Sequence, residues 1–251
     1  MRRGGGKLLD RGLLPGLMVL VLVAGVWRLG HPKKIKSLTT HLVISEIQTS
    51  GGTGHTFDEF VELYNPTGST VDLTGMKLSK KTAGGAQSDL VATLSGTIAA
   101  NRFFLIAPQD FTSISVAPDV TYATESASVA DNNTVVLYDT DGLTVVDLVG
   151  MGSATASESA TIGNPAGGKS IERKAMPGST KDTMKIGGSD EFVGNGLDSG
   201  NNSTDFLVRD IPQPQNSLSD REPVAPTATV VPTPTETPVP TEVPTPTPEL
   251  T

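Results

Sequence analysis

The sequence predicts an all-β protein built as an antiparallel β-sandwich. Short apolar or alternating runs recur along the body of the chain, with Gly, Pro, Asn and Asp at turns between them. Aromatic residues make up only 4%, whereas there are 27 glycines and 18 prolines, which suits short strands better than a helical bundle. Beyond the N-terminus, no run shows a convincing helical period of apolar residues.

The chain divides into three parts by composition. Residues 1–36 are predicted to be an export signal or signal-anchor helix, residues 37–219 the β-sandwich, and residues 220–251 a disordered tail rich in Pro and Thr. A tail of this composition has too little apolar surface to fold and favours extended polyproline II. It would serve as a semi-rigid spacer.

Export is predicted from the N-terminus, where four basic residues precede the uncharged run Gly12–Trp27. An uncleaved anchor is favoured, because the best small-residue cleavage candidate, Val23–Gly25, lies inside the apolar run. The protein is therefore expected to be membrane-anchored through this helix, with its domain outside the cytoplasm. Secretion after signal cleavage is the alternative.

Composition excludes several classes of site. The chain has no cysteine, which rules out disulfides and thiolate metal ligands. Its net charge of −8 leaves no basic footprint on the domain, so no nucleic-acid partner is expected.

The predicted strands follow one another at short intervals. Phe103–Ile106 is the most apolar segment and is predicted to be buried on both faces, between two sheets. Loops are predicted at 80–89, 153–168 and 177–202. The strand candidates are Leu42–Ile47, Phe60–Tyr64, Val71–Leu73, Met76–Leu78, Leu90–Leu94, Thr97–Ala107 with a break at Ala100–Asn101, Thr134–Tyr138, Leu143–Val149, Ser170–Lys174 and Asp205–Asp210.

Two carboxylates, Glu46 and Glu62, are expected on neighbouring strands. Paired carboxylates can act as acid and base, as in glycoside hydrolysis. The favoured interpretation is structural, with the pair accepting hydrogen bonds at a sheet end, because the chain offers little aromatic surface on which a sugar could stack.

One loop carries enough hard oxygen ligands to suggest calcium, the one cofactor that the sequence suggests. The favoured interpretation, however, is a loop folded on its own Asx turns. The turn Asp139–Gly142 resembles the start of a calcium loop but is predicted to be a plain hairpin, and the three histidines show no zinc-site spacing. The calcium candidates are Asp190, Asp198, Asn201, Asn202 and Asp205.

Several segments, in order, resemble a lamin-tail domain of the bacterial exported type. The opening is LVISEI followed by DEFVELYNPTGSTVDLTGMKL, and the resemblance extends over most of Leu42–Ser217. The later segments are GTIAANRFFLIA, DNNTVVLYDTDGLTVVDLVGMG, GKSIERK and GNGLDSGNNSTDFLVRDIPQPQNS. Each segment alone is weak, but their shared order is specific.

This resemblance implies an immunoglobulin-like β-sandwich without catalytic residues. It favours a non-catalytic binding or attachment module of the cell envelope, with an unidentified envelope protein or glycan as partner. Two alternatives stay open: a surface hydrolase using clustered carboxylates, with or without calcium, and a passive structural spacer. The stretch 153–202 is longer and more polar than a minimal domain needs, so it is the expected place for a ligand surface particular to this chain.

Overall fold

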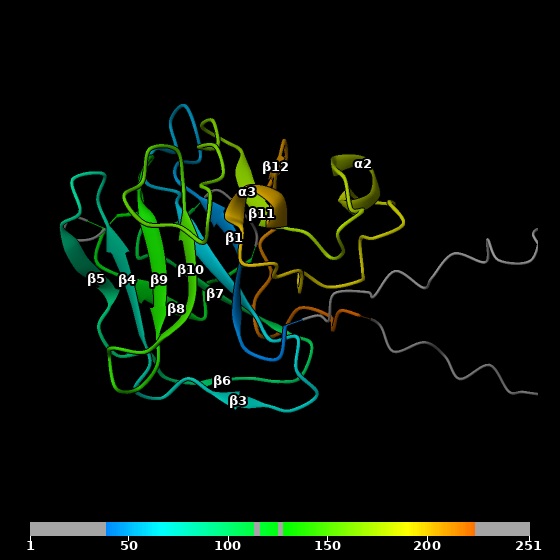
Figure 1. Cartoon of the computed structure of the whole chain (residues 1–251), viewed down its shortest axis with the longest axis horizontal. Coiled ribbons are helices and arrows are strands. Elements are labelled where there is room, and N and C mark those ends of the chain that lie inside the picture. The colour runs from blue at the N-terminus through cyan, green and yellow to red at the C-terminus, as the bar shows by residue number, and fades with distance from the viewer. Residues whose placement is uncertain (1–38, 113–115, 125–127, 224–251) are drawn as a thin grey trace, which may run out of the picture. The chain divides into compact units, whose positions relative to one another are not determined.

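The structure is a computed structural model that describes residues 39–112, 116–124 and 128–223, and Figure 1 shows its elements. The predicted N-terminal helix and residues 224–251 of the predicted Pro/Thr tail lie outside these residues, whereas residues 220–223 are described. Within the described ranges, no helix is long and apolar enough to cross a membrane.

The larger sheet has six strands, and its neighbouring pairs are antiparallel with one exception, the parallel pair β7–β8. The predicted antiparallel sandwich therefore differs from the structure at this edge. In spatial order the strands are β12 (Phe206–Arg209), β11 (Ser170–Arg173), β1 (Val43–Gln48), β2 (Phe60–Tyr64), β7 (Phe103–Pro108) and β8 (Val120–Tyr122).

The second sheet has four strands, and two further strands pair separately. Its order is β10 (Val145–Gly150), β9 (Thr134–Tyr138), β4 (Lys77–Lys81) and β5 (Gln87–Val91), while β3 (Val71–Asp72) pairs with β6 (Thr97–Ile98). The loop predicted at 80–89 was too long, because β4 and β5 extend into it as a hairpin. Gln87, Ser88 and Asp89 are exposed on this edge strand, where backbone pairing needs no apolar side chains.

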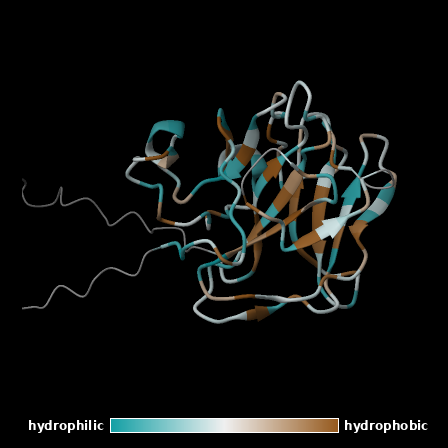
Figure 2. Ribbon diagram, turned by 180° about the vertical axis from the view of Figure 1, so that it is seen from behind, coloured by the Kyte–Doolittle hydropathy of each residue, from teal (hydrophilic) through white to brown (hydrophobic). Residues whose placement is uncertain are grey.

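The two sheets pack face to face around one hydrophobic core. Figure 2 shows hydrophobic residues concentrated on the strands, whereas the helix near the chain's C-terminal part is largely hydrophilic. The buried cluster draws on both sheets and includes Ile44, Ile47, Val61, Leu63, Phe104, Ile106 and Ile171 from the first and Leu78, Leu90, Val135, Leu137 and Val149 from the second. This arrangement confirms the predicted sandwich.

The outer face of the six-stranded sheet is also buried. Strand β7 has no exposed residue, as predicted. Its inner residues Phe104 and Ile106 face the second sheet, whereas Leu105 packs in a separate cluster with Phe60 and the partly buried Phe111. The outer cover is thus formed by loops rather than by a sheet.

Two short helices interrupt the polar C-terminal part. Helix α2 (Lys181–Met184) is capped by Thr180, and α3 (Asn202–Asp205) is capped by Asn201. The predicted strand Asp205–Asp210 therefore begins one residue later, at Phe206, because Asp205 closes the turn of α3.

Candidate functional site

Three glutamates form a row across neighbouring strands, which we call the carboxylate ladder. Glu46 of β1 lies opposite Glu172 of β11 on one side and Glu62 of β2 on the other. The sequence prediction that Glu46 and Glu62 lie on neighbouring strands is confirmed. All three side chains are buried on the outer face of the six-stranded sheet.

A β-bulge in β1 places Glu46 on this face. The register between β1 and β2 shifts between Ile44 and Glu46, and both Ile44 and Ile47 point into the core although they are three residues apart. An extra residue in one strand resets the alternation of its side chains. Ser45 and Glu46 therefore both leave the core face.

The segment of residues 211–222 crosses the ladder, and we call it the strap. The backbone amide of Gln213 donates to Glu46 Oε1 at 3.3 Å, and the amide of Gln215 donates to Glu62 Oε2. Farther along, Ser217 donates from its amide to Asp119 Oδ2 at 3.0 Å. The strap thus passes over β1 and β2 and reaches the connection before β8.

Side chains of the sheet supply further donors to the ladder. The hydroxyl of Ser45 donates to Glu62, and the hydroxyl of Ser170 donates to Glu46. Arg209 Nη1 lies 2.9 Å from Glu172 Oε2 as an ion pair, without the alignment of a hydrogen bond. Each ladder carboxyl is therefore engaged inside the protein.

Burial makes the ladder hard to ionise. It raises the pKa of Glu46 to about 7, and it raises the pKa of Glu172 to about 8, to which the charge of Glu46 adds. The pKa of Glu62 is also raised well above its usual range by burial and by neighbouring Glu46. The strap residue Glu222 follows the same trend, since burial raises its pKa to about 7.

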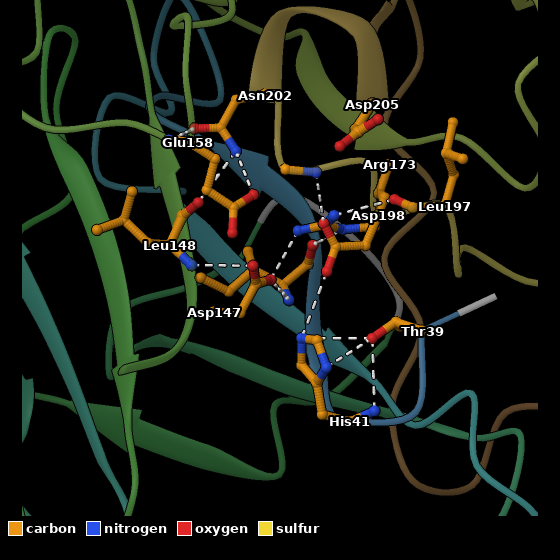
Figure 3. A network of polar contacts seen from close by, with 12 residues as sticks. Thr39, His41, Asp147, Leu148, Glu158, Arg173, Leu197, Asp198, Asn202 and Asp205 are labelled. Atoms are coloured by element: carbon orange, nitrogen blue, oxygen red, sulfur yellow. Dashed lines mark hydrogen bonds and ion pairs between the residues drawn. The ribbon is translucent and has the colours of Figure 1, made fainter. Parts of the chain in front are cut away.

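A second polar cluster (Figure 3) lies where β10 approaches β1, and Arg173 of β11 reaches into it. The carboxylates of Glu158, Asp198 and Asp205 place one oxygen each within 4.8 Å of the others. Beside them, the buried Arg173 and Asp147 form an ion pair at 2.6 Å. Burial, with the nearby charge of Asp147 next, raises the pKa of Glu158 to about 7.

The structure brings together some of the calcium candidates but not all. Asp198 and Asp205 belong to the second cluster, while the Asn202 carbonyl oxygen accepts from the amides of Gly150 and Glu158. Asn201 caps α3. Asp190 follows α2, where hydrogen bonds from Thr183 and from the serines beside it lower its pKa, and it is absent from the cluster.

Several oxygens of this cluster already have internal partners. Asp205 Oδ2 accepts from the amides of Ser199 and Asn201, at 2.7 and 3.3 Å. Asp198 Oδ1 accepts from the Gly200 amide, and its Oδ2 lies 3.4 Å from His41 Nε2. Calcium binding here stays a prediction, which a thermal melt with calcium and with chelator tests.

Sequence reasoning missed Glu158, Arg173 and Glu172 as members of these clusters. Glu158 lies in a polar loop, forty residues before Asp198. The fold alone brings Glu158 and Asp198 together, so no local sequence signal could have identified Glu158. Glu172 could have been predicted from the sequence, because a pairing of the strand SIERK with β1 would have placed it beside Glu46.

The turn Asp139–Gly142 and His55, which the sequence analysis also considered as metal ligands, make local contacts in a hairpin and in a loop. The turn Asp139–Gly142 is a hairpin closed by a bond from the Asp139 amide to the Thr144 carbonyl, as predicted. His55 Nδ1 lies 2.7 Å from Asp58 in the loop between β1 and β2.

Two open hollows lie on either side of the strap's start, and both include Gln213 in their walls. Each has a volume of about 410 Å³. The first is lined by α2 and the end of β12, with the exposed residues Ile186 and Ile211 beside Lys181 and Lys185. The second is acidic and has Phe192 and Met184 next to Glu191 and Asp220.

These observations define a class of protein: a β-sandwich module whose clustered carboxylates are buried and whose C-terminal part adds an open surface. The model of the Lamin Tail Domain family matches residues 36–153. The predicted resemblance is therefore confirmed for that stretch. Strands β11 and β12 lie beyond this match, yet they complete the same sheet beside β1.

The chain is also similar to a solved structure, that of a DUF4876 family protein from Bacteroides thetaiotaomicron. The two share 14% sequence identity with a TM-score of 0.47, over 69% of this chain and 72% of the other. No curated protein matches the chain.

Proposed function

We propose that this chain is a non-catalytic binding module displayed outside the cytoplasm, anchored by its N-terminal segment, and that it holds a protein partner at the two hollows. We call this surface the α2 face, made of the residues around Ile186, Phe192, Ile211 and Gln213. The sequence pattern of residues 1–36 supports the location. The lamin-tail domain supports a binding role rather than a catalytic one.

The observation that carries the proposal is the contrast between buried acids and exposed apolar side chains. Both central ladder carboxylates are covered by the strap and accept internal hydrogen bonds, so a substrate could not reach them. In contrast, Ile186, Phe192 and Ile211 are 69%, 54% and 71% exposed around the hollows. Clustered exposed apolar residues rimmed by charge are typical of protein-binding surfaces.

The charges of the α2 face indicate what kind of partner fits. Lys181 and Lys185 lie at the first hollow, whereas Glu191 and Asp220 lie at the second. The partner we propose is a polypeptide segment with apolar side chains that carries an acidic residue toward α2 and a basic residue toward the strap. A glycan would lack both the apolar side chains and this charge order.

Binding is tested with the full chain and envelope extracts from its host. A partner captured by wild type should be lost when Ile211→Ser is used and retained by Leu143→Ser, a control in which an equally exposed apolar residue is changed on the β9–β10 hairpin. Reversing the charge of Lys181 and Lys185 should weaken capture, and a matching reversal in the partner should restore it.

The proposal fails if Ile211→Ser and Leu143→Ser capture the same partner equally well. Loss of the captured material after glycosidase treatment, with no effect of protease, would identify a glycan ligand instead. Turnover of a glycan or peptide substrate that disappears in Glu62→Gln would support the hydrolase alternative.

A further inference from the structure

The strap is attached to the sheet through groups that can lose protons. Between residues 212 and 215 the sequence is Pro-Gln-Pro-Gln, and proline has no amide hydrogen. The amides of Gln213 and Gln215 are therefore the backbone donors in this stretch, and they bind Glu46 and Glu62 respectively. The strap crosses the sheet by two bonds to two adjacent, buried carboxyl groups.

The charges around these carboxyls are unbalanced. Arg209 of β12 is the cation beside the ladder, and it pairs with Glu172. The other titratable or charged groups around the ladder and the strap are Glu46 of β1, Glu62 and Tyr64 of β2, Arg102 before β7, Asp119 before β8, Glu172 of β11, Glu191 after α2, and Asp220, Arg221 and Glu222 of the strap. Full ionisation would place several negative charges under one cation.

We propose that the strap is a proton-controlled latch, which is closed while the carboxylate ladder keeps its protons and opens at Gln213–Gln215 when the ladder loses them. Two adjacent carboxylates repel one another, and burial penalises each charge. Lifting the strap admits water to the ladder and relieves both costs. Because the pKa values of Glu46 and Glu172 are raised to about 7 and 8, opening becomes more favourable as the pH rises to and through these values.

The C-terminal half of the strap has anchors outside the ladder. The amide of Glu222 donates to the Asn101 carbonyl at 2.9 Å, and Arg102 Nη1 donates to the Ser217 carbonyl at 3.3 Å. Opening is therefore confined to the part above β1 and β2. Because Gln213 also lines both hollows, opening changes the shape of the α2 face.

The test is amide hydrogen exchange of the full-length protein, followed residue by residue by NMR between pH 6.0 and 8.5. A local opening that releases one proton becomes up to about tenfold more favourable per pH unit between the pKa of the open state and the raised pKa of the closed state, and it levels off above the closed-state value. After correction for the intrinsic pH dependence of exchange, protection of the Gln213 and Gln215 amides should fall at least about tenfold. Amides of β9 should stay better protected than the strap amides at every pH, and they should lose no more protection than the fall in global stability accounts for.

Substitution of ladder glutamates by glutamine, which has the same shape but does not ionise, tests whether the ladder causes the loss of strap protection. Glu46→Gln and Glu62→Gln each remove one ionisable ladder group, so the fall in strap protection should shrink or vanish. Glu158→Gln is the matched control, because Glu158 also has a pKa raised to about 7 but lies in the other cluster. If either ladder variant fails to fold, Glu172→Gln replaces it, and the wild-type titration alone still decides.

Three results would overturn the proposal. Strap protection that stays level across the pH range shows that no latch exists. A fall that persists undiminished in both ladder variants assigns the titration to other groups. Equal protection of the strap and β9 amides at every pH shows that both exchange only when the whole domain unfolds.

Discussion

Arg173 shows how one residue joins the two sheets. Its side chain is fully buried, and it donates to Asp147 of β10, to the Ile44 carbonyl of β1 and to the Leu197 carbonyl. The guanidinium also lies 4.6 Å from the centre of the Phe206 ring. The string SIERK predicted the strand, but the inward arginine depends on a carboxylate from a distant strand.

Replacing Arg173 should therefore destabilise the domain strongly. Arg173→Ala leaves Asp147 charged and buried without its partner, which costs about 3–5 kcal/mol. Urea unfolding of the two proteins measures this difference.

Lys169→Ala is the control at the surface. Lys169 pairs with Asp210 at 2.6 Å, but both side chains are exposed, so solvent screens the pair and its loss should change the stability little. Equal losses in the two variants would show that the Arg173 pair has no special structural role.

At the scale of elements, α3 fixes the polar loops of the second cluster. Asn202 accepts from the amides of Gly150 and Glu158 and donates to the Leu148 carbonyl at 3.0 Å. The four residues of α3 are too few to be stable alone. Their place is set by this one side chain, which ties the helix to β10 and to the loop before β11.

Asn202→Ala should leave the Gly150 and Glu158 amides without acceptors. An unsatisfied buried group costs about 1–3 kcal/mol, so the melting temperature should fall by several degrees. Ser203→Ala is the neighbouring control, since the Ser203 hydroxyl binds only exposed Asn201. A fall of equal size in Ser203→Ala would contradict the role given to Asn202.

The bounds of some strands could be predicted from the sequence, whereas the bulge in β1 and the strand β8 were not predicted. Strands β2 and β9 were predicted with their observed bounds, because turn residues flank both runs. The bulge in β1 was not predicted, although the inward Ile44 and Ile47 are a signal for it. Strand β8 lay in a segment without a clear pattern, because its parallel pairing with β7 depends on the fold and not on local periodicity.

At the scale of the molecule, the sandwich could be predicted from the recurrence of strands and turns, and the lamin-tail resemblance from ordered segments. The strap could not, because polar and proline-rich residues give no hydrophobic period. Its position depends on hydrogen bonds to carboxylates more than 150 residues away in the chain. The strap forms part of the walls of both hollows, so the hollows could not be predicted from the sequence either. The sequence predicted a ligand surface only in the stretch 153–202.

The buried carboxyls also determine how stability depends on pH. A carboxyl whose pKa is higher in the folded than in the unfolded protein contributes stability below its unfolded value, near 4.3 for Glu, and that stability is lost as the pH rises through the folded value. Glu46, Glu59 and Glu172 have pKa values of about 7, 7 and 8. The domain should therefore be more stable in mild acid than in mild base.

The free energy of unfolding at pH 5.5 and at pH 8.5, measured by urea titration of the full chain, tests most directly whether these carboxyls are protonated structural groups. We expect a fall of at least about 1.4 kcal/mol at pH 8.5, the equivalent of one pKa unit. Glu46→Gln and Glu62→Gln should reduce the fall. A free energy that is level or higher at pH 8.5 would contradict the account, because it would mean that the ladder is already ionised in the folded protein and is available for acid–base chemistry.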